Sequence, residues 1–206
     1  MTRPSQLKVN SIFRRLAAGW SRWLIVICCY GTLHGTTQAQ TTDLDPEKFA
    51  TVQAAYIYNL SRFVQWPQLP TSSFHICLIG HAQQLLLQQL QQGIKGKTIH
   101  TLPVEIALIA PELLHTDPNG QQLQQCQVLY LTQHPEQYGF ANLPQLTGQH
   151  VLRISSPDLP RNSYSQVDLV LENNRIQLYL NSQSLQQSGL QVNPALLSIA
   201  RQRSKS

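Results

Sequence analysis

The chain lacks a concentrated charge of either sign beyond its first residues. Its formal net charge of +5 comes from 15 lysines and arginines against 10 acidic residues. The basic residues that precede position 23 are Arg3, Lys8, Arg14, Arg15 and Arg22. The rest of the chain is formally neutral, and its basic residues are scattered along it. Because binding through phosphate contacts needs a clustered basic surface, the sequence argues against a nucleic-acid partner.

The sequence also lacks the short motifs that mark common catalytic and nucleotide-binding sites. It contains no G-x-S-x-G, G-x-G-x-x-G, P-loop or H-E-x-x-H pattern. Beyond position 39 its histidines stand singly, and none lies four positions from another: His75, His81, His100, His115, His134 and His150. We therefore predict no catalytic residues, no metal site and no required cofactor. A binding or regulatory protein is favoured over an enzyme, and a hydrolase is the weakest alternative.

The sequence has no apolar run near the roughly 20 residues that a membrane span requires. Residues 23–30 are apolar, but the run breaks at Gly31. It follows the basic N-terminus and precedes the small-residue stretch 37–39, which together make the three parts of a secretory signal. We predict that residues 1–39 are a signal peptide cleaved near Ala39, rather than a retained anchor. Both Cys28 and Cys29 then leave with the leader.

Two cysteines remain, Cys77 and Cys126, separated by 49 positions. In an oxidising compartment an even pair is more often bridged than free. The alternative is that both are small buried side chains. Cys77 lies inside an expected strand and Cys126 just ahead of another, so neighbouring strands would favour a bridge. Closing such a loop stabilises the fold by roughly 4 kcal/mol in the chain-entropy model.

The first element expected in the exported chain is a long amphipathic helix. Residues 40–48 comprise a tether and the start of the helix. Asp45 is the expected N-cap, and Pro46 follows it at the first helical position. Hydrophobic residues then recur at helical steps: Phe49, Val52, Tyr56, Leu60 and Phe63. The helix is expected to end before Trp66, which precedes a proline. Tyr58 falls off this stripe.

Residues 49–203 alternate between expected strands and helices. The apolar runs at 74–79, 99–107, 128–131 and 151–154 predict strands, and the pairs 168–172 and 175–180 flank Asn173-Asn174 as a tight hairpin. Helical patterns or helix starts occupy 82–92, 117–126, 135–143 and 194–200. We therefore predict a single-domain layered α/β sandwich with a mixed, mainly parallel sheet and a late antiparallel hairpin.

One position could hold a small ligand. Gly80 and His81 follow the expected strand 74–79, and α/β sheets place ligands at the carboxyl ends of their strands. The alternative is that His81 is an ordinary loop histidine. This alternative is favoured because the sequence indicates no partner residue for His81. Gly80 and His81 are thus a ligand-pocket candidate.

Several ordered motifs resemble a known family. The stretch 52–67, VQAAYIYNLSRFVQWP, resembles the opening signature of the YfiR family of small periplasmic proteins. Further matches follow in the same order: ICLIG at 76–80, GKTI at 96–99, CQVLYL at 126–131 and LLSIA at 196–200. One departure is that this chain has SYSQVDL at 163–169, where members carry glycine before the late hairpin. The resemblance covers nearly all of the exported chain.

The resemblance implies a function in signalling. It implies a periplasmic homodimer that holds a membrane-bound diguanylate cyclase inactive through the periplasmic domain of the cyclase. It also implies an outer-membrane lipoprotein that relieves this inhibition, so that envelope stress or redox change alters cyclic-di-GMP and biofilm formation. The cysteine pair fits a redox-sensitive fold, and Tyr58, Arg62 and Trp66 are candidates for the partner surface. The alternative is a periplasmic sensor of a small ligand.

Overall fold

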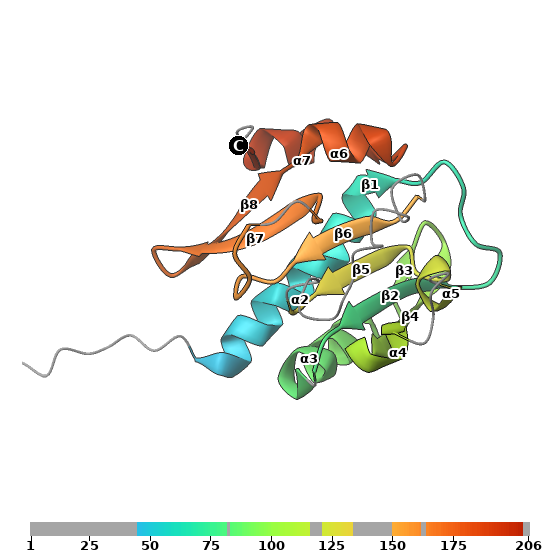
Figure 1. Ribbon diagram of the computed structural model, residues 1–206, viewed down its shortest axis with the longest axis horizontal. Coiled ribbons are helices and arrows are strands. Elements are labelled where there is room, and N and C mark those ends of the chain that lie inside the picture. Colours follow the sequence, from blue (N-terminus) through green and yellow to red (C-terminus); the bar gives the residue numbers. More distant parts are fainter. Residues whose placement is uncertain (1–44, 82, 116–120, 134–149, 162–163, 204–206) are drawn as a thin grey trace, which may run out of the picture. The chain divides into compact units, whose positions relative to one another are not determined.

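Strand β2 (Phe74–Ile79) lies inside an eight-stranded sheet whose order is β10-β8-β7-β6-β5-β2-β4-β3 (Figure 1). The other strands are β3 (Thr98–Ile99), β4 (Leu102–Ile109), β5 (Val128–Leu131), β6 (Leu152–Ser155), β7 (Val167–Glu172), β8 (Arg175–Leu180) and β10 (Arg201–Gln202). All neighbours pair in parallel except β3 with β4 and β7 with β8, which are antiparallel. The predicted mixed, mainly parallel sheet with a late hairpin is confirmed.

The structure is a computed structural model, and it describes residues 45–81, 83–115, 121–133, 150–161 and 164–203. These residues belong to one compact unit. The predicted helix at 135–143, the helix start at Asp117-Pro118 and the whole predicted leader lie outside the described residues. Among the described helices, none is both long enough and apolar enough to cross a membrane.

The two faces of the sheet carry separate hydrophobic clusters. In β2 the side chains of Phe74, Ile76 and Leu78 belong to the larger cluster, whereas Cys77 and Ile79 belong to the smaller one. Successive strand residues point to opposite faces, and this alternation buries β2 on both sides. A central strand of a parallel sheet is accordingly apolar throughout.

Helices cover both faces unequally. The larger cluster takes buried side chains from α2 (Pro46–Phe63), α3 (Gln84–Ile94), α6 (Ser182–Gln187) and α7 (Pro194–Ile199) (Figure 1). The smaller cluster takes Leu123 from α5 (Gln121–Gln124). The short helix α4 (Pro111–His115) follows β4. Helices α2 and α3 pack against one another on the same face. Their shared packing on the larger cluster sets the spacing between them.

Helix α2 begins where the sequence indicates. The Asp45 side chain accepts a hydrogen bond from the backbone N–H of Glu47 at 3.0 Å, and this bond holds the pKa of Asp45 below its ordinary value. Pro46 occupies the first turn. The helix ends at Phe63, and the chain continues into β1 (Val64–Gln65), which pairs with β9 (Gln191–Val192) in a separate two-stranded sheet.

The segment between α3 and β4 differs most from expectation. The strand predicted at 99–107 is divided into β3 and β4 by a tight turn at His100 and Thr101, whose φ angles are 49° and 72°. Histidine tolerates the left-handed region but β-branched threonine rarely adopts it, so the sequence gives little sign of this turn. Helix α3 continues through Gly93 to Ile94 instead of stopping at residue 92.

The C-terminal half follows its local signals closely. The hairpin between β7 and β8 turns at Asn173 and Asn174, whose φ angles of 50° and 60° match the predicted two-residue turn. The Asn193 side chain caps α7 by accepting from the N–H of Ala195 at 2.9 Å. Strand β6 runs from Leu152 to Ser155, one residue later than predicted.

A buried hydrogen bond ties α2 to the sheet. The Tyr130 hydroxyl in β5 donates to Oε1 of Gln53 at 2.5 Å, and Tyr130 and Gln53 are both buried. Burial raises the pKa of Tyr130 well above its ordinary value. The hydroxyl therefore stays protonated and donates throughout the physiological pH range.

We expect Tyr130→Phe to lower the free energy of unfolding by about 1–3 kcal/mol, because it leaves the Gln53 carbonyl buried without its donor. Gln53→Leu should cost a similar amount. Urea denaturation of the two single variants and the double variant measures this coupling. The double variant should lose less than the sum of the single losses, and additive losses would contradict the hydrogen bond.

Candidate functional site

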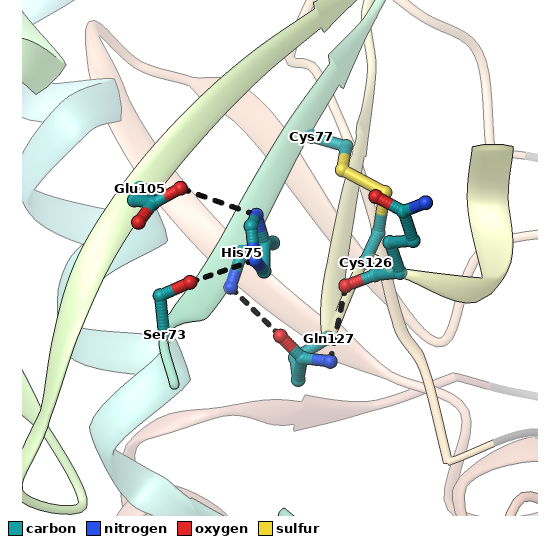
Figure 2. The surroundings of a disulfide bond; sticks show 7 residues. Ser73, His75, Cys77, Glu105, Cys126 and Gln127 are labelled. Carbon is teal, nitrogen blue, oxygen red and sulfur yellow. Dashed lines mark hydrogen bonds and ion pairs between the residues drawn. A yellow bond between two sulfur atoms is a disulfide. The ribbon is translucent and has the colours of Figure 1, made fainter. Parts of the chain in front are cut away.

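Cys77 and Cys126 form a disulfide between neighbouring strands (Figure 2). Cys77 lies in β2, Cys126 precedes β5, and their Cα atoms are 5.8 Å apart. Strands β2 and β5 pair in parallel with Ile76 opposite Val128, which brings the two cysteines together. Each residue is 1% exposed, and both belong to the smaller hydrophobic cluster. The disulfide is therefore shielded from solvent in the folded protein.

His75 lies two positions before Cys77 in the same strand and is held by its neighbours (Figure 2). Its Nε2 is 2.8 Å from the Ser73 hydroxyl, and its Nδ1 is 3.9 Å from Oε2 of Glu105, its pairing partner in β4. The backbone N–H of His75 donates to Oε1 of Gln127 at 2.7 Å. These contacts join β2 to β4 and to β5 beside the disulfide.

The row Ser73, His75 and Glu105 has the residue types of a hydrolase relay. Its geometry is poor for that chemistry, because Ser73 is only 5% exposed and the 3.9 Å separation exceeds a hydrogen bond. A substrate carbonyl could not approach the Ser73 hydroxyl without rearrangement. The row is better explained as a tie between strands, and a hydrolase gains no support from it.

The predicted ligand position at the end of β2 is tightly packed. Gly80 has a φ of 140°, and a Cβ atom there would lie 1.7 Å from Oγ1 of Thr132. That Thr132 hydroxyl donates to the carbonyl of Ile79 at 2.8 Å. His81 is an exposed residue whose Nε2 lies 3.2 Å from Oε1 of Glu112. Thr132 thus fills the space beside Gly80, and neither Gly80 nor His81 lines the hollows considered below.

A groove of about 830 Å³ lies between α2 and α3, and we call it the α2/α3 groove. Both helices and the turn that follows α3 form its walls. The residues that line it are Thr51, Ala54, Ala55, Tyr58, Asn59, Arg62, Gln89, Leu90, Gln92, Gly93, Ile94, Gly96, Lys97 and Thr98. Two of the three partner-surface candidates, Tyr58 and Arg62, therefore lie together in it.

Two cations lie near the ring of Tyr58 in this groove. Lys97 Nζ is 5.0 Å and Arg62 Cζ is 5.7 Å from the centre of its ring, both within cation–π range. The Tyr58 hydroxyl donates to the carbonyl of Thr98 at 3.3 Å, which fixes the ring against the turn. Lys97 was not among the predicted surface residues. It lies in a turn after α3, where no periodic pattern points to a shared surface.

Trp66, the third partner-surface candidate, lies elsewhere. It is 8% exposed, and its ring packs edge-on against Phe74 with centroids 5.0 Å apart. The His100 ring lies edge-on to the same indole, with the ring centroids 5.7 Å apart. The aromatic ring is thus part of the core beneath the β3–β4 turn. The partner-surface prediction is corrected on this point, because a buried side chain cannot contact a partner.

A polar bridge marks the groove near the start of α2. The Thr51 hydroxyl donates to Oε1 of Gln89 at 3.0 Å, and the Gln89 amide lies 3.5 Å from Oε1 of Glu47. These contacts join α2 to α3. The groove therefore has a polar stretch at Thr51 and Gln89, next to Glu47, and a cationic stretch at Arg62 and Lys97.

Comparison with known proteins identifies a family match. The model of a family described as YfiR/HmsC-like matches residues 50–201. That range includes most of α2, the disulfide, the α2/α3 groove and the main sheet up to the first residue of β10. No curated protein matches the chain.

Because both cysteines are buried, we expect reduction of the disulfide to depend on unfolding. Incubation with dithiothreitol in native buffer should reduce it slowly, at a rate that rises with added urea. Thiol alkylation followed by mass spectrometry measures the rate. A double variant, Cys77→Ser with Cys126→Ser, should lose up to about 4 kcal/mol of stability, since the loop spans 49 residues. Rapid reduction without urea would contradict the shielding.

Gly93 offers a second test of the local geometry. It lies in the last turn of α3, and an added Cβ would meet no atom within 4 Å. We expect Gly93→Ala to raise the free energy of unfolding by up to about 1 kcal/mol, because alanine has the higher helix propensity. Thermal unfolding followed by circular dichroism measures it. A destabilised Gly93→Ala protein would show that the groove floor is packed after all.

Proposed function

The chain belongs to the YfiR/HmsC-like family, and on this premise we propose that it negatively regulates a membrane-bound diguanylate cyclase by direct contact in the periplasm. The observation that carries the proposal is the family match over residues 50–201, which takes in nearly all of the described chain. This is a regulatory, non-catalytic family. The inaccessible Ser73 hydroxyl agrees with a protein that acts by binding.

Export supports the same location. The first 39 residues have the pattern of a cleavable signal, with a basic start, a short apolar run and Ala39 at the expected cleavage point. A disulfide between Cys77 and Cys126 fits an oxidising compartment outside the cytoplasm. The proposed partner is the periplasmic domain of an inner-membrane cyclase. An outer-membrane lipoprotein that sequesters the regulator and a homodimeric state complete the proposal.

Redox sensitivity is part of this proposal, and the burial of the disulfide indicates how it would operate. A reductant cannot reach the Cys77–Cys126 bond without local opening, because both residues are 1% exposed. Oxidising conditions therefore matter most while the exported chain folds. Failure to form the bridge would lower the folded fraction and so weaken repression.

A small-ligand sensor is the second candidate function. The packing of Thr132 against Gly80 weakens the pocket predicted at Gly80 and His81. A hollow of about 710 Å³ at the other end of β2, lined among others by His75, Cys126 and His150, is a more suitable place. A small molecule bound there would raise the melting temperature in proportion to the logarithm of its concentration. A screen of melting temperatures discriminates this function from the first.

The test of the regulatory function is intracellular cyclic-di-GMP in the native host. We expect deletion of the gene to raise cyclic-di-GMP, because repression of the cyclase is lost. A complete copy should restore the low level, and a copy lacking residues 1–39 should not, because it stays in the cytoplasm. Mass spectrometry of nucleotide extracts measures the change. An unchanged level on deletion would contradict the proposed function and favour the ligand sensor.

A further inference from the structure

The α2/α3 groove gathers positive charge at Arg62 and Lys97, while the carboxylate of Glu47 lies beside Gln89 at the other end. Its lining includes Arg62 and Lys97 and no carboxylate. A second hollow of about 550 Å³ adjoins it, shares Ile94, Gly96, Lys97 and Thr98 with it, and adds Lys95. The two hollows therefore adjoin at Lys97, and their lining residues together include three cations.

This concentration contrasts with the other cations of a formally neutral domain. Outside the two hollows, four described basic side chains pair with carboxylates: Lys48 with Asp45 at 3.5 Å, Arg161 with Glu172 at 3.5 Å, Arg201 with Glu172 at 2.8 Å and Arg203 with Asp168 at 3.4 Å. Arg175 forms no ion pair within the described residues, but it stands alone at the exposed start of β8. Within the described part of the chain, Arg62, Lys95 and Lys97 form no ion pair. Their positive charge is available to a ligand.

The floor of the groove is low and partly apolar. Ala54, Ala55 and Leu90 contribute small or apolar surface, and Gly93 leaves open space where any other residue would place a side chain. No contact in the structure requires glycine at position 93, because an added Cβ meets nothing within 4 Å. The absent side chain therefore deepens the groove at a cost in helix propensity.

We propose that the α2/α3 groove binds an extended acidic segment of the partner protein. Carboxylates of the segment would lie beside Arg62 and Lys97, and a small apolar side chain would lie on the floor near Leu90. A protein segment fits better than a lipid surface, because the charges line a depression and a bilayer would meet only the rims of the helices. The inference rests on the proposed function only for the identity of the partner.

A labelled peptide tests the chemistry directly. The probe is a short fluorescein-labelled peptide in which glutamate alternates with alanine, and its matched control carries glutamine in place of glutamate. We expect the glutamate peptide to bind the oxidised, exported form with an affinity that falls several-fold between 50 and 200 mM salt, roughly as screening of a few charge pairs requires. Fluorescence anisotropy measures the binding. Equal binding of the glutamine peptide would overturn the inference.

Variants place the binding in the groove. Arg62→Glu should weaken binding about tenfold or more, whereas Arg175→Glu, the same charge change on the exposed start of β8, should leave it unchanged. Gly93→Trp should block the groove and abolish binding, because the indole would fill the open space beside Gly93. Circular dichroism checks that the variants fold. If a variant does not fold, the salt dependence of peptide binding by the unaltered protein still tests the inference. Retained binding in folded Arg62→Glu and Gly93→Trp would overturn the assignment, as would binding of phosphatidylglycerol vesicles without binding of the peptide.

The same variants separate this inference from the proposed function in cells. If deletion raises cyclic-di-GMP and Gly93→Trp fails to lower it while Arg175→Glu succeeds, the groove contacts the partner. If Gly93→Trp represses as fully as the unaltered protein, the groove assignment is wrong and the regulatory function stands. If deletion changes nothing, the proposed function fails, and the peptide experiment alone decides whether the groove binds acidic segments.

Discussion

Burial of β2 on both faces is the constraint on which the rest of the structure depends. Phe74, Ile76 and Leu78 must face one cluster while Cys77 and Ile79 face the other. A shift of one residue in register would exchange the two sets, moving Cys77 away from Cys126 and placing Leu78 in the smaller cluster. The positions of the disulfide and of the helices above the larger cluster are therefore set by the same alternation.

The groove is a consequence of that larger cluster rather than an independent feature. Helix α2 is anchored to the sheet through Tyr130 and Gln53, and α3 packs beside it through Leu86 and Leu90, both of which are buried. These contacts fix the distance between the two helices. Where small residues such as Ala55 and Gly93 follow on the outer surface, that fixed distance leaves a depression. The backbone that lines the groove is thus positioned by the core below it.

The sequence predicts those parts of the fold whose cause is local. Repeated apolar positions define α2, paired asparagines define the β7–β8 turn, and Asn193 defines the start of α7. The pairing of β1 with β9 joins distant residues, involves only two residues of each strand, and leaves no pattern in the sequence. For the same reason the sequence indicates Tyr58 and Arg62 but not Lys97, which joins them only through the tertiary packing of α3, and it misplaces Trp66 on the surface.

The disulfide and the groove lie on opposite faces of the sheet, and this separation has a consequence for regulation. Alternation along β2 directs Cys77 away from the cluster that supports α2 and α3. Loss of the bridge would then act through the stability of the whole domain and would not reshape the groove. Redox conditions would set how much folded regulator is present, whereas Arg62, Lys97 and Gly93 would decide what it binds. In a domain organised in this way, redox conditions would change the amount of folded protein without changing which partner it binds.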